Sequence, residues 1–338
     1  MAKNAQSPKE KRRLSWIILI LFLTLCVFFL VLTFYWSAEP ELFDVYKAAQ
    51  QKASSENTQL VTGYVTTNTL IKISKTILEK RGGYISNDVT PPGIFMDNIP
   101  NWEFGVLVQI RDFTKALRND ISRAQTQSIE NQFLAKAEPQ FNVDSNSWLF
   151  PSAENEYYDG IEALESYLQQ LTDRRDENTQ FFARADNLRD WLRTAANRLG
   201  SLSQRLSASV GQERINTNLA GEAEAVQSTY EPDIIDVKTP WMQIDDVFYE
   251  ARGTCWALIH LLRAIEVDFA EVLKKKNATR SVQQIIRELE ATQRTVWSPM
   301  VLNGSDFGFF ANYSLVMSSY ISRANAGIID LRELLSQG

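Results

Sequence analysis

The longest uninterrupted apolar stretch of the chain lies close to its N-terminus. Residues 14–36 are 23 residues without a charge, enough helix to cross a bilayer core of about 30 Å at about 1.5 Å per residue. Tyr35 and Trp36 stand at its end. Aromatic rings favour the headgroup boundary of a membrane, whereas a signal peptidase requires small side chains at this position. A cleaved signal peptide also has a shorter apolar region, of about 7–15 residues. The pattern therefore predicts an uncleaved transmembrane anchor in contact with the lipid bilayer.

Beyond this span, the apolar positions recur mostly with helical spacing. Helices are predicted over residues 42–52, 62–80 and 102–137, and Pro139 ends the third. Many β-branched side chains leave a strand over residues 61–67 as an alternative. The segment between the second and third helices, residues 82–105, has four glycines and three prolines in 24 residues and is predicted to be an ordered loop packed on the bundle.

The middle of the chain has the clearest periodicity. Apolar residues from Tyr157 to Leu171 and from Phe181 to Leu206 alternate at spacings of three and four, as in a coiled coil. The two seams are out of phase across the polar break between them. This favours either an antiparallel hairpin or a stutter within one long helix. Neighbours in the same chain can fill such a seam, and so can a second chain; the intrachain alternative is favoured.

The last third of the chain follows a polar, proline-containing stretch, residues 208–240. Three further helices are predicted over residues 241–275, 281–296 and 309–335. With no strand-rich region evident, the fold class is all-α: an N-terminal transmembrane helix followed by a multi-helix bundle with a coiled-coil-like hairpin. The expected organisation comprises a basic tail (1–13), the anchor (14–36), a helical region (37–207), a polar linker (208–240) and a C-terminal three-helix region packing on the former (241–338).

The charges flanking the span predict its orientation. Five of the 35 basic residues and one of the 41 acidic residues precede it, and the positive-inside rule therefore places residues 1–13 in the cytosol and the rest outside. The part outside carries a formal charge of −10, because 30 basic and 40 acidic residues remain. A domain this acidic is a poor partner for nucleic acid. Cys255 is the only cysteine beyond the span, so no intrachain disulfide is expected there.

The chain offers little for most catalytic chemistries. His260 is its only histidine, which excludes a clustered histidine metal site, and no phosphate-binding glycine loop or zinc-protease motif occurs. No metal or cofactor is predicted. Cys255 falls in the centre of an apolar helix face and is predicted to be an inert core residue.

Two groups of residues are candidates for binding a ligand or partner. In the helix that begins near Trp241, polar residues line one edge of the apolar face, and Arg252 can stack on Trp256 four positions later. In the loop, Glu103 can bond back to a free backbone N–H near the start of the next helix. The candidates are Asp88, Asp97, Asn98, Asn101, Trp102, Glu103, Asp245, Arg252 and Trp256.

Two long phrases of the chain resemble a known family. They are "GGYISNDVTPPGIFMDNIPNWEFGVLVQIRD" and "FFANYSLVMSSYISRANAGIIDLREL". Both are similar to an uncharacterised proteobacterial family of single-span inner-membrane proteins, catalogued as a domain of unknown function. The resemblance implies a bacterial inner-membrane location with a periplasmic C-terminal domain. It brings no catalytic residues.

Three hypotheses of function follow. The favoured hypothesis is a structural or protein-interaction role in the cell envelope, with an envelope protein or a second copy of the chain as partner. The alternatives are a periplasmic cell-wall enzyme using carboxylates such as Asp97 or Glu103, and the ligand-binding module of a sensor complex. The partner, the ligand and the oligomeric state do not follow from the sequence.

Overall fold

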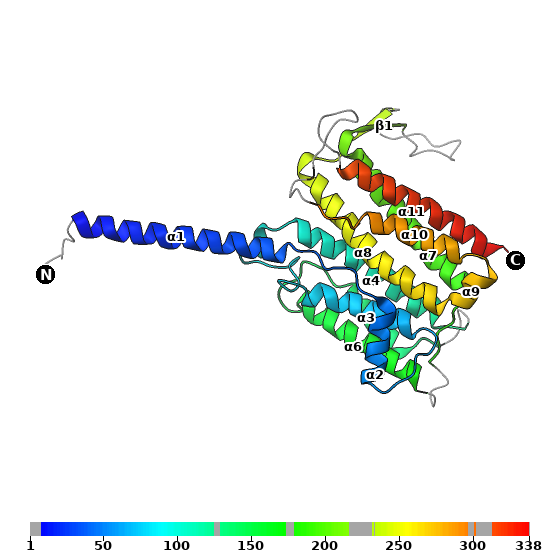
Figure 1. Ribbon diagram of the computed structural model, residues 1–338. Coiled ribbons are helices and arrows are strands. Elements are labelled where there is room, and N and C mark those ends of the chain that lie inside the picture. Colours follow the sequence, from blue (N-terminus) through cyan, green and yellow to red (C-terminus); the bar gives the residue numbers. More distant parts are fainter. Residues whose placement is uncertain are drawn as a thin grey trace.

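The computed structural model describes residues 8–124, 129–173, 179–215, 232, 234–296, 301 and 313–337. Within these ranges the regular elements are helices except for one two-stranded ribbon, which confirms the all-α prediction. A single long helix, α1, projects from a body in which the other helices pack side by side (Figure 1).

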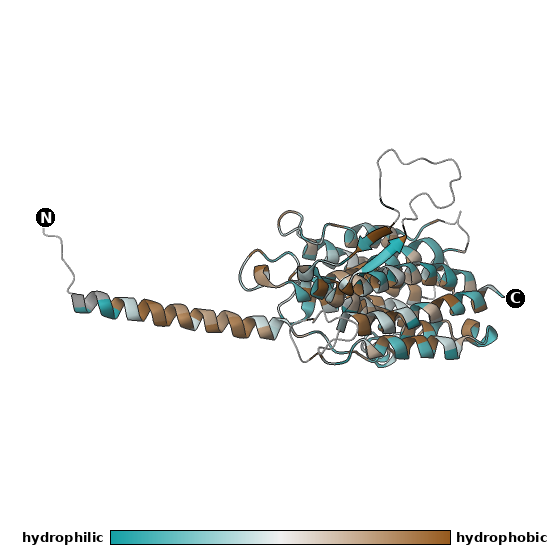
Figure 2. Ribbon diagram, turned by 90° about the horizontal axis from the view of Figure 1, so that it is seen from above, coloured by the Kyte–Doolittle hydropathy of each residue, from teal (hydrophilic) through white to brown (hydrophobic). Residues whose placement is uncertain are grey.

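Helix α1 (Pro8–Trp36) contains one segment, Arg12–Trp36, that is long and apolar enough to cross a membrane. Its apolar residues are not buried by the rest of the chain, and it stands out as a brown rod in Figure 2. Its last turn meets the turn that follows α3: the guanidinium carbon of Arg81 lies 5.1 Å from the centre of the Tyr35 ring. The end of the apolar helix is thus in contact with the body.

The body is built from helices whose bounds follow the predicted pattern in most places. The first of them are α2 (Val45–Ser55) and α3 (Tyr64–Glu79), so the strand alternative over residues 61–67 was wrong. The remaining elements are η1 (Gly93–Phe95), α4 (Asn98–Ala116), the π-helical turn η2 (Leu117–Ile121), α5 (Gln132–Phe141), α6 (Ala153–Thr172), α7 (Ala185–Ser207), η3 (Ala208–Val210), η4 (Trp241–Gln243), α8 (Ile244–Asp268), α9 (Ala270–Lys275), α10 (Thr279–Ala291) and α11 (Tyr313–Ser336).

The single helix predicted over residues 102–137 was wrong. The structure has α4 and, after η2, a separate α5. Helix α4 begins four residues earlier than predicted because the Asp97 side chain accepts the backbone N–H of Asn98. Helix α5 begins anew because the Asn131 side chain accepts the N–H groups of Phe133 and Leu134. Pro139 lies inside α5 instead of ending a helix.

The two heptad helices do not form the predicted hairpin, and they are not one helix with a stutter. Helix α6 packs against α3 and α5, whereas α7 packs most extensively against α11. The described residues between them, 173 and 179–184, are not helical, and the Phe182 N–H donates to the carbonyl of Ile121, the last residue of η2, at 2.7 Å. The seam of α7 is buried within the chain, as the intrachain alternative predicted.

The remaining differences lie in the last third of the chain. Residues predicted as one helix over 241–275 form η4, α8 and α9, with Phe269 outside both α-helices. Part of the predicted polar linker forms an antiparallel ribbon of β1 (Gln212–Ile215) and β2 (Ile234–Val237), paired from Gln212↔Val237 to Ile215↔Ile234. Residues 309–312 of the last predicted helix lie outside the described residues.

The buried apolar residues form one cluster that includes side chains from both sides of residues 208–240. The most extensive helix contacts are α4 with α8 and α7 with α11. Helices α4 and α8 approach closely because each presents a glycine to the other's backbone. A Cβ built on Gly253 would overlap the Trp102 carbonyl oxygen, and one on Gly105 would overlap that of Glu250. This crossing positions the candidate site.

Candidate functional site

The two groups of candidate residues predicted from the sequence meet where α4 and α8 begin. The side-chain amide of Asn101 donates to the Asp246 carboxylate at 2.7 Å and to the Asp97 carbonyl at 3.0 Å. Further along, the rings of Trp102 and Trp256 pack edge to face with their centres 5.2 Å apart. Asp97 is exposed, whereas both tryptophans are buried. The exposed part of the site is therefore its acidic end.

Glu103 is fully buried and holds the preceding loop. Its carboxylate lies 2.6 Å from the Lys80 ammonium, whose side chain is only 2% exposed. It also accepts the N–H groups of Ile85 at 2.9 Å and Ser86 at 2.8 Å. Burial raises the pKa of Glu103, while Lys80, Ser86 and Ile85 act in the opposite direction. Glu103 does bond back to free backbone donors, but these lie in the loop and not at the start of its own helix.

Arg252 ties the segment after α1 to the body. Its guanidinium donates three hydrogen bonds to the Glu39 carboxylate, at 2.6, 2.7 and 3.0 Å, and others to the carbonyls of Thr292 and Arg294 at 2.8 and 2.9 Å. The expected stacking on Trp256 was wrong, because these bonds direct the guanidinium elsewhere. The guanidinium instead lies over the ring of Phe248, 5.9 Å from its centre.

His260 forms a second tie to the same segment. Its side chain is completely buried. The Phe43 N–H donates to Nε2 at 3.0 Å, the Nδ1–H donates to the Trp256 carbonyl at 2.7 Å, and the Phe43 ring stacks on the imidazole at 3.9 Å. This bonding requires the neutral Nδ1–H tautomer, since Nε2 acts as an acceptor. Burial, with a smaller contribution from Arg263 and Lys72, lowers the pKa of His260 to about 3.

The His260 tie makes stability depend on pH. Because the pKa falls from its ordinary 6.5 to about 3 on folding, the unfolded chain takes up a proton that the folded chain excludes. The resulting stabilisation is complete above about pH 6.5 and is lost as the pH falls towards 3, at up to about 1.4 kcal/mol per pH unit. Thermal unfolding followed by circular dichroism should show a weaker pH dependence in His260→Gln than in the wild type. Carboxylates titrate in both proteins, so parallel profiles would contradict the buried neutral histidine.

The acidic end of the site contains three neighbouring carboxylates. Burial, together with the charges of Asp245 and Asp97, raises the pKa of Asp246 to about 6. Burial likewise raises the pKa of Asp245. Among the described residues, no group of three or more histidine, cysteine, aspartate or glutamate side chains is arranged to hold a metal ion.

Cys255 lies in the core, as predicted. It is fully buried, and burial raises the pKa of its thiol to about 12. A thiol in this setting is a poor nucleophile, because the thiolate is the reactive form.

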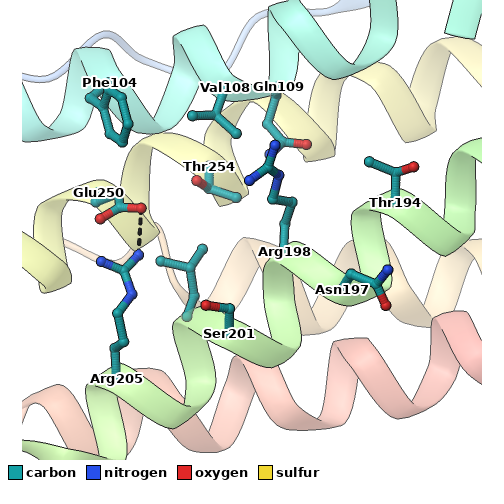
Figure 3. A pocket seen from close by; sticks show the side chains of 11 residues that line it. Phe104, Val108, Gln109, Thr194, Asn197, Arg198, Ser201, Arg205, Glu250 and Thr254 are labelled. Atoms are coloured by element: carbon teal, nitrogen blue, oxygen red, sulfur yellow. Dashed lines mark hydrogen bonds and ion pairs between the residues drawn. The ribbon is translucent and has the colours of Figure 1, made fainter. Parts of the chain in front are cut away.

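A groove that the sequence did not reveal lies between α4, α7 and α8 (Figure 3), with a volume of about 380 Å³. Arg205 and Glu250 form an ion pair at one end. Gln109 is 1% exposed, and its Nε2 has no hydrogen-bond partner. Arg198 and Arg205 are seven residues apart, so they share one face of α7. This spacing was the signal in the sequence that could have indicated the groove. The groove therefore offers hydrogen-bond donors to a small polar group.

A second hollow, of about 590 Å³, lies beside the segment that follows α1. Residues 37–42 form one side, and Tyr249, Arg252 and Trp256 form the other. Two of the candidate residues from α8 therefore line a cavity next to the apolar helix. Glu39 and Arg252 both line it, so the ion pair that ties this segment to the body also forms part of the wall of the hollow.

Comparison with known proteins identifies the family of the chain. No curated protein and no solved structure matches the chain. A family model described as "Uncharacterized protein conserved in bacteria (DUF2333)" matches residues 9–338, which include all the site residues described above. The resemblance seen in the two long sequence phrases is confirmed. The chain belongs to the DUF2333 family of proteins conserved in bacteria.

Proposed function

We propose that this protein is a single-pass inner-membrane protein whose helical body is held at the periplasmic surface and docks other envelope proteins. The family is conserved in bacteria, and α1 supplies a helix of the length and composition that a membrane anchor requires. The excess of basic residues before the span favours an exported body.

The observation that carries the proposal is the fixed connection between α1 and the body. Only residues 37–44 separate α1 from α2. Within them, Glu39 is bonded to Arg252 and Phe43 to His260. Both partners are buried, so these contacts oppose free movement of the body about the end of α1. An enzyme that acts on a distant polymer benefits from a long tether, whereas a short rigid connection suits a protein that meets its partners at the membrane.

The best docking position is the exposed end of the α4–α8 pair. Trp241 and Met242, which directly precede α8, are 68% and 83% exposed. Tryptophan and methionine are enriched at the centres of protein interfaces. The neighbouring carboxylates of Asp97, Asp245 and Asp246 complement a basic segment. We therefore propose that a basic segment of another membrane protein binds here.

The enzymatic alternative is less well supported by the geometry. Glu103 is fully enclosed, and Lys80, Ile85 and Ser86 already bond its carboxylate. A substrate would have to displace these contacts to reach it. Asp97 is accessible, but its side chain accepts the Asn98 N–H at the start of α4. The geometry therefore favours a binding surface over a pair of catalytic carboxylates.

A photo-crosslinking amino acid at position 242 tests the docking site in native bacterial membranes. The matched control is position 329 on α11, where the native isoleucine is 50% exposed. We expect a discrete crosslinked protein, identified by mass spectrometry, from position 242 only. Asp97→Asn should reduce its yield, because asparagine preserves the helix cap but removes a charge. Equal products from positions 242 and 329, or none from either, would contradict docking at this end.

The exported location is tested separately. A C-terminal reporter enzyme that is active only outside the cytosol should be active in the full-length fusion. Activity of a cytosol-specific reporter at the same position would overturn the proposed topology.

A further inference from the structure

Two loops of the body are hydrogen-bonded to each other close to the end of α1. The first runs from Arg81 to Asp97 and the second from Asn142 to Ser152. The Tyr84 hydroxyl donates to the Ser145 carbonyl at 3.1 Å, and the Asn87 amide donates to the Ser147 carbonyl at 2.9 Å. The two loops therefore form one structural unit, the paired loops.

The tips of the paired loops expose an unusual amount of apolar surface. Phe95 is 80% exposed and Phe150 is 96% exposed. Their exposed apolar neighbours are Val89, Ile94, Trp148 and Leu149. Removing a side chain of this size from water contributes about 1.5–3 kcal/mol, and a contiguous exposed apolar patch marks an interaction surface. Both loops place such side chains outward while their bases are bonded to the body.

The paired loops lie beside the end of the apolar helix. A Cβ on Gly82 would come within 2.7 Å of the Trp36 ring, and Arg81 covers the Tyr35 ring. Figures 1 and 2 show loops on the side of the body from which α1 leaves, and in Figure 2 one of them carries a short hydrophobic turn. Tyr35 and Trp36 are the residue types that mark a membrane–water boundary. A membrane crossed by α1 therefore has its surface at the level of these loops.

We propose that the paired loops insert their apolar tips into the headgroup region of the membrane that α1 crosses. This inference rests on the proposed membrane anchoring and adds a second, independent membrane contact. We expect the tips to contact lipid, because the paired loops lie beside the end of the helix that spans the membrane. Acidic side chains, Asp88, Asp97 and Asp144, lie in the same loops, so insertion should not require anionic lipid. The body would then have three attachments to one membrane: α1 and two loop tips.

Fluorescence quenching in vesicles tests this with the full-length chain. A single environment-sensitive thiol probe is placed at Phe95→Cys or Phe150→Cys in a Cys26→Ala background, where the remaining Cys255 is buried. The protein is reconstituted into phosphatidylcholine vesicles containing lipid with a spin label near the headgroup. We expect loss of fluorescence at both loop positions and none at Ile329→Cys, an exposed position on α11. Adding anionic lipid should leave the quenching unchanged.

The native Cys26 separates failure of this inference from failure of the anchor. A probe on Cys26 in the wild-type chain should be quenched by spin labels deep in the acyl chains. Quenching at Cys26 with none at positions 95 and 150 would overturn the loop insertion and leave the anchor intact. No quenching at any position would overturn both. Protection of the loop probes from aqueous iodide without lipid quenching would assign the tips to a second copy of the chain and would likewise overturn the proposal.

Discussion

Replacing Lys80 by methionine is expected to lower the free energy of unfolding by about 3–5 kcal/mol, the usual cost of leaving one partner of a buried ion pair without its counterion. The Lys80 and Glu103 side chains are 2% and 0% exposed, so water cannot replace the lost ammonium. Lys80 also donates to the Gly83 carbonyl at 2.7 Å. Methionine retains most of the apolar stem, which isolates the loss of charge from the loss of packing.

The matched control is Arg323→Met. Arg323 forms an ion pair with Glu288 at 2.9 Å, but its side chain is 50% exposed, and such pairs contribute only about 0–1 kcal/mol. Denaturant unfolding of the full-length chain in detergent, followed by tryptophan fluorescence, compares the two variants. A Lys80→Met effect no larger than that of Arg323→Met would contradict the enclosed pair.

Removing both charges should not restore stability in this case. A buried ion pair can often be exchanged for apolar residues at little cost. Here the Glu103 carboxylate also accepts the N–H groups of Ile85 and Ser86, and these donors would lose their acceptor in a Lys80→Met/Glu103→Leu double variant. Because Ile85 and Ser86 belong to the paired loops, the double variant should also weaken lipid quenching at position 95. This links the buried pair to the position of the loop tips.

Local periodicity predicted the helices well where a helix is long and uninterrupted. Helices α6 and α7 follow the heptad seams closely, because each buries one continuous apolar face. The same seams did not identify their partners, since a row of leucines and alanines fits several neighbouring helices equally well. The pattern therefore could not show that α7 packs on α11 instead of forming a hairpin with α6.

The candidate site was predicted in its parts but not in its connections. Arg252 was assigned to Trp256 because a residue four positions away is the only partner that helical spacing reveals. Its actual partner, Glu39, is 213 positions away, and the partner of His260 is 217 positions away. Both partners belong to the short segment after α1, whose sequence carries no periodic signal. Contacts of this kind require the three-dimensional arrangement.

The α4–α8 crossing leads to the second large prediction. Gly253→Ala should lower the free energy of unfolding by about 3 kcal/mol or more, at or above the upper end of the usual cost of overpacking. The new Cβ would overlap the Trp102 carbonyl oxygen and lie 2.8 Å from its carbonyl carbon. These are backbone atoms, so no side-chain rotation relieves the overlap and the two helices must move apart. Their separation would loosen the Trp102–Trp256 contact and the neighbouring Arg252 tie.

Gly200→Ala provides a control with the opposite expected sign. Gly200 also lies within a helix, α7, but its nearest neighbour would be the Asn325 amide nitrogen at 3.5 Å, an ordinary contact. Alanine there should stabilise the protein by about 0.5–1 kcal/mol, because glycine loses more backbone freedom on folding. Thermal unfolding of both variants in detergent tests the pair. If Gly253→Ala also stabilised the protein, the helices would have room between them, and the close crossing that brings Asn101 to Asp246 would not exist.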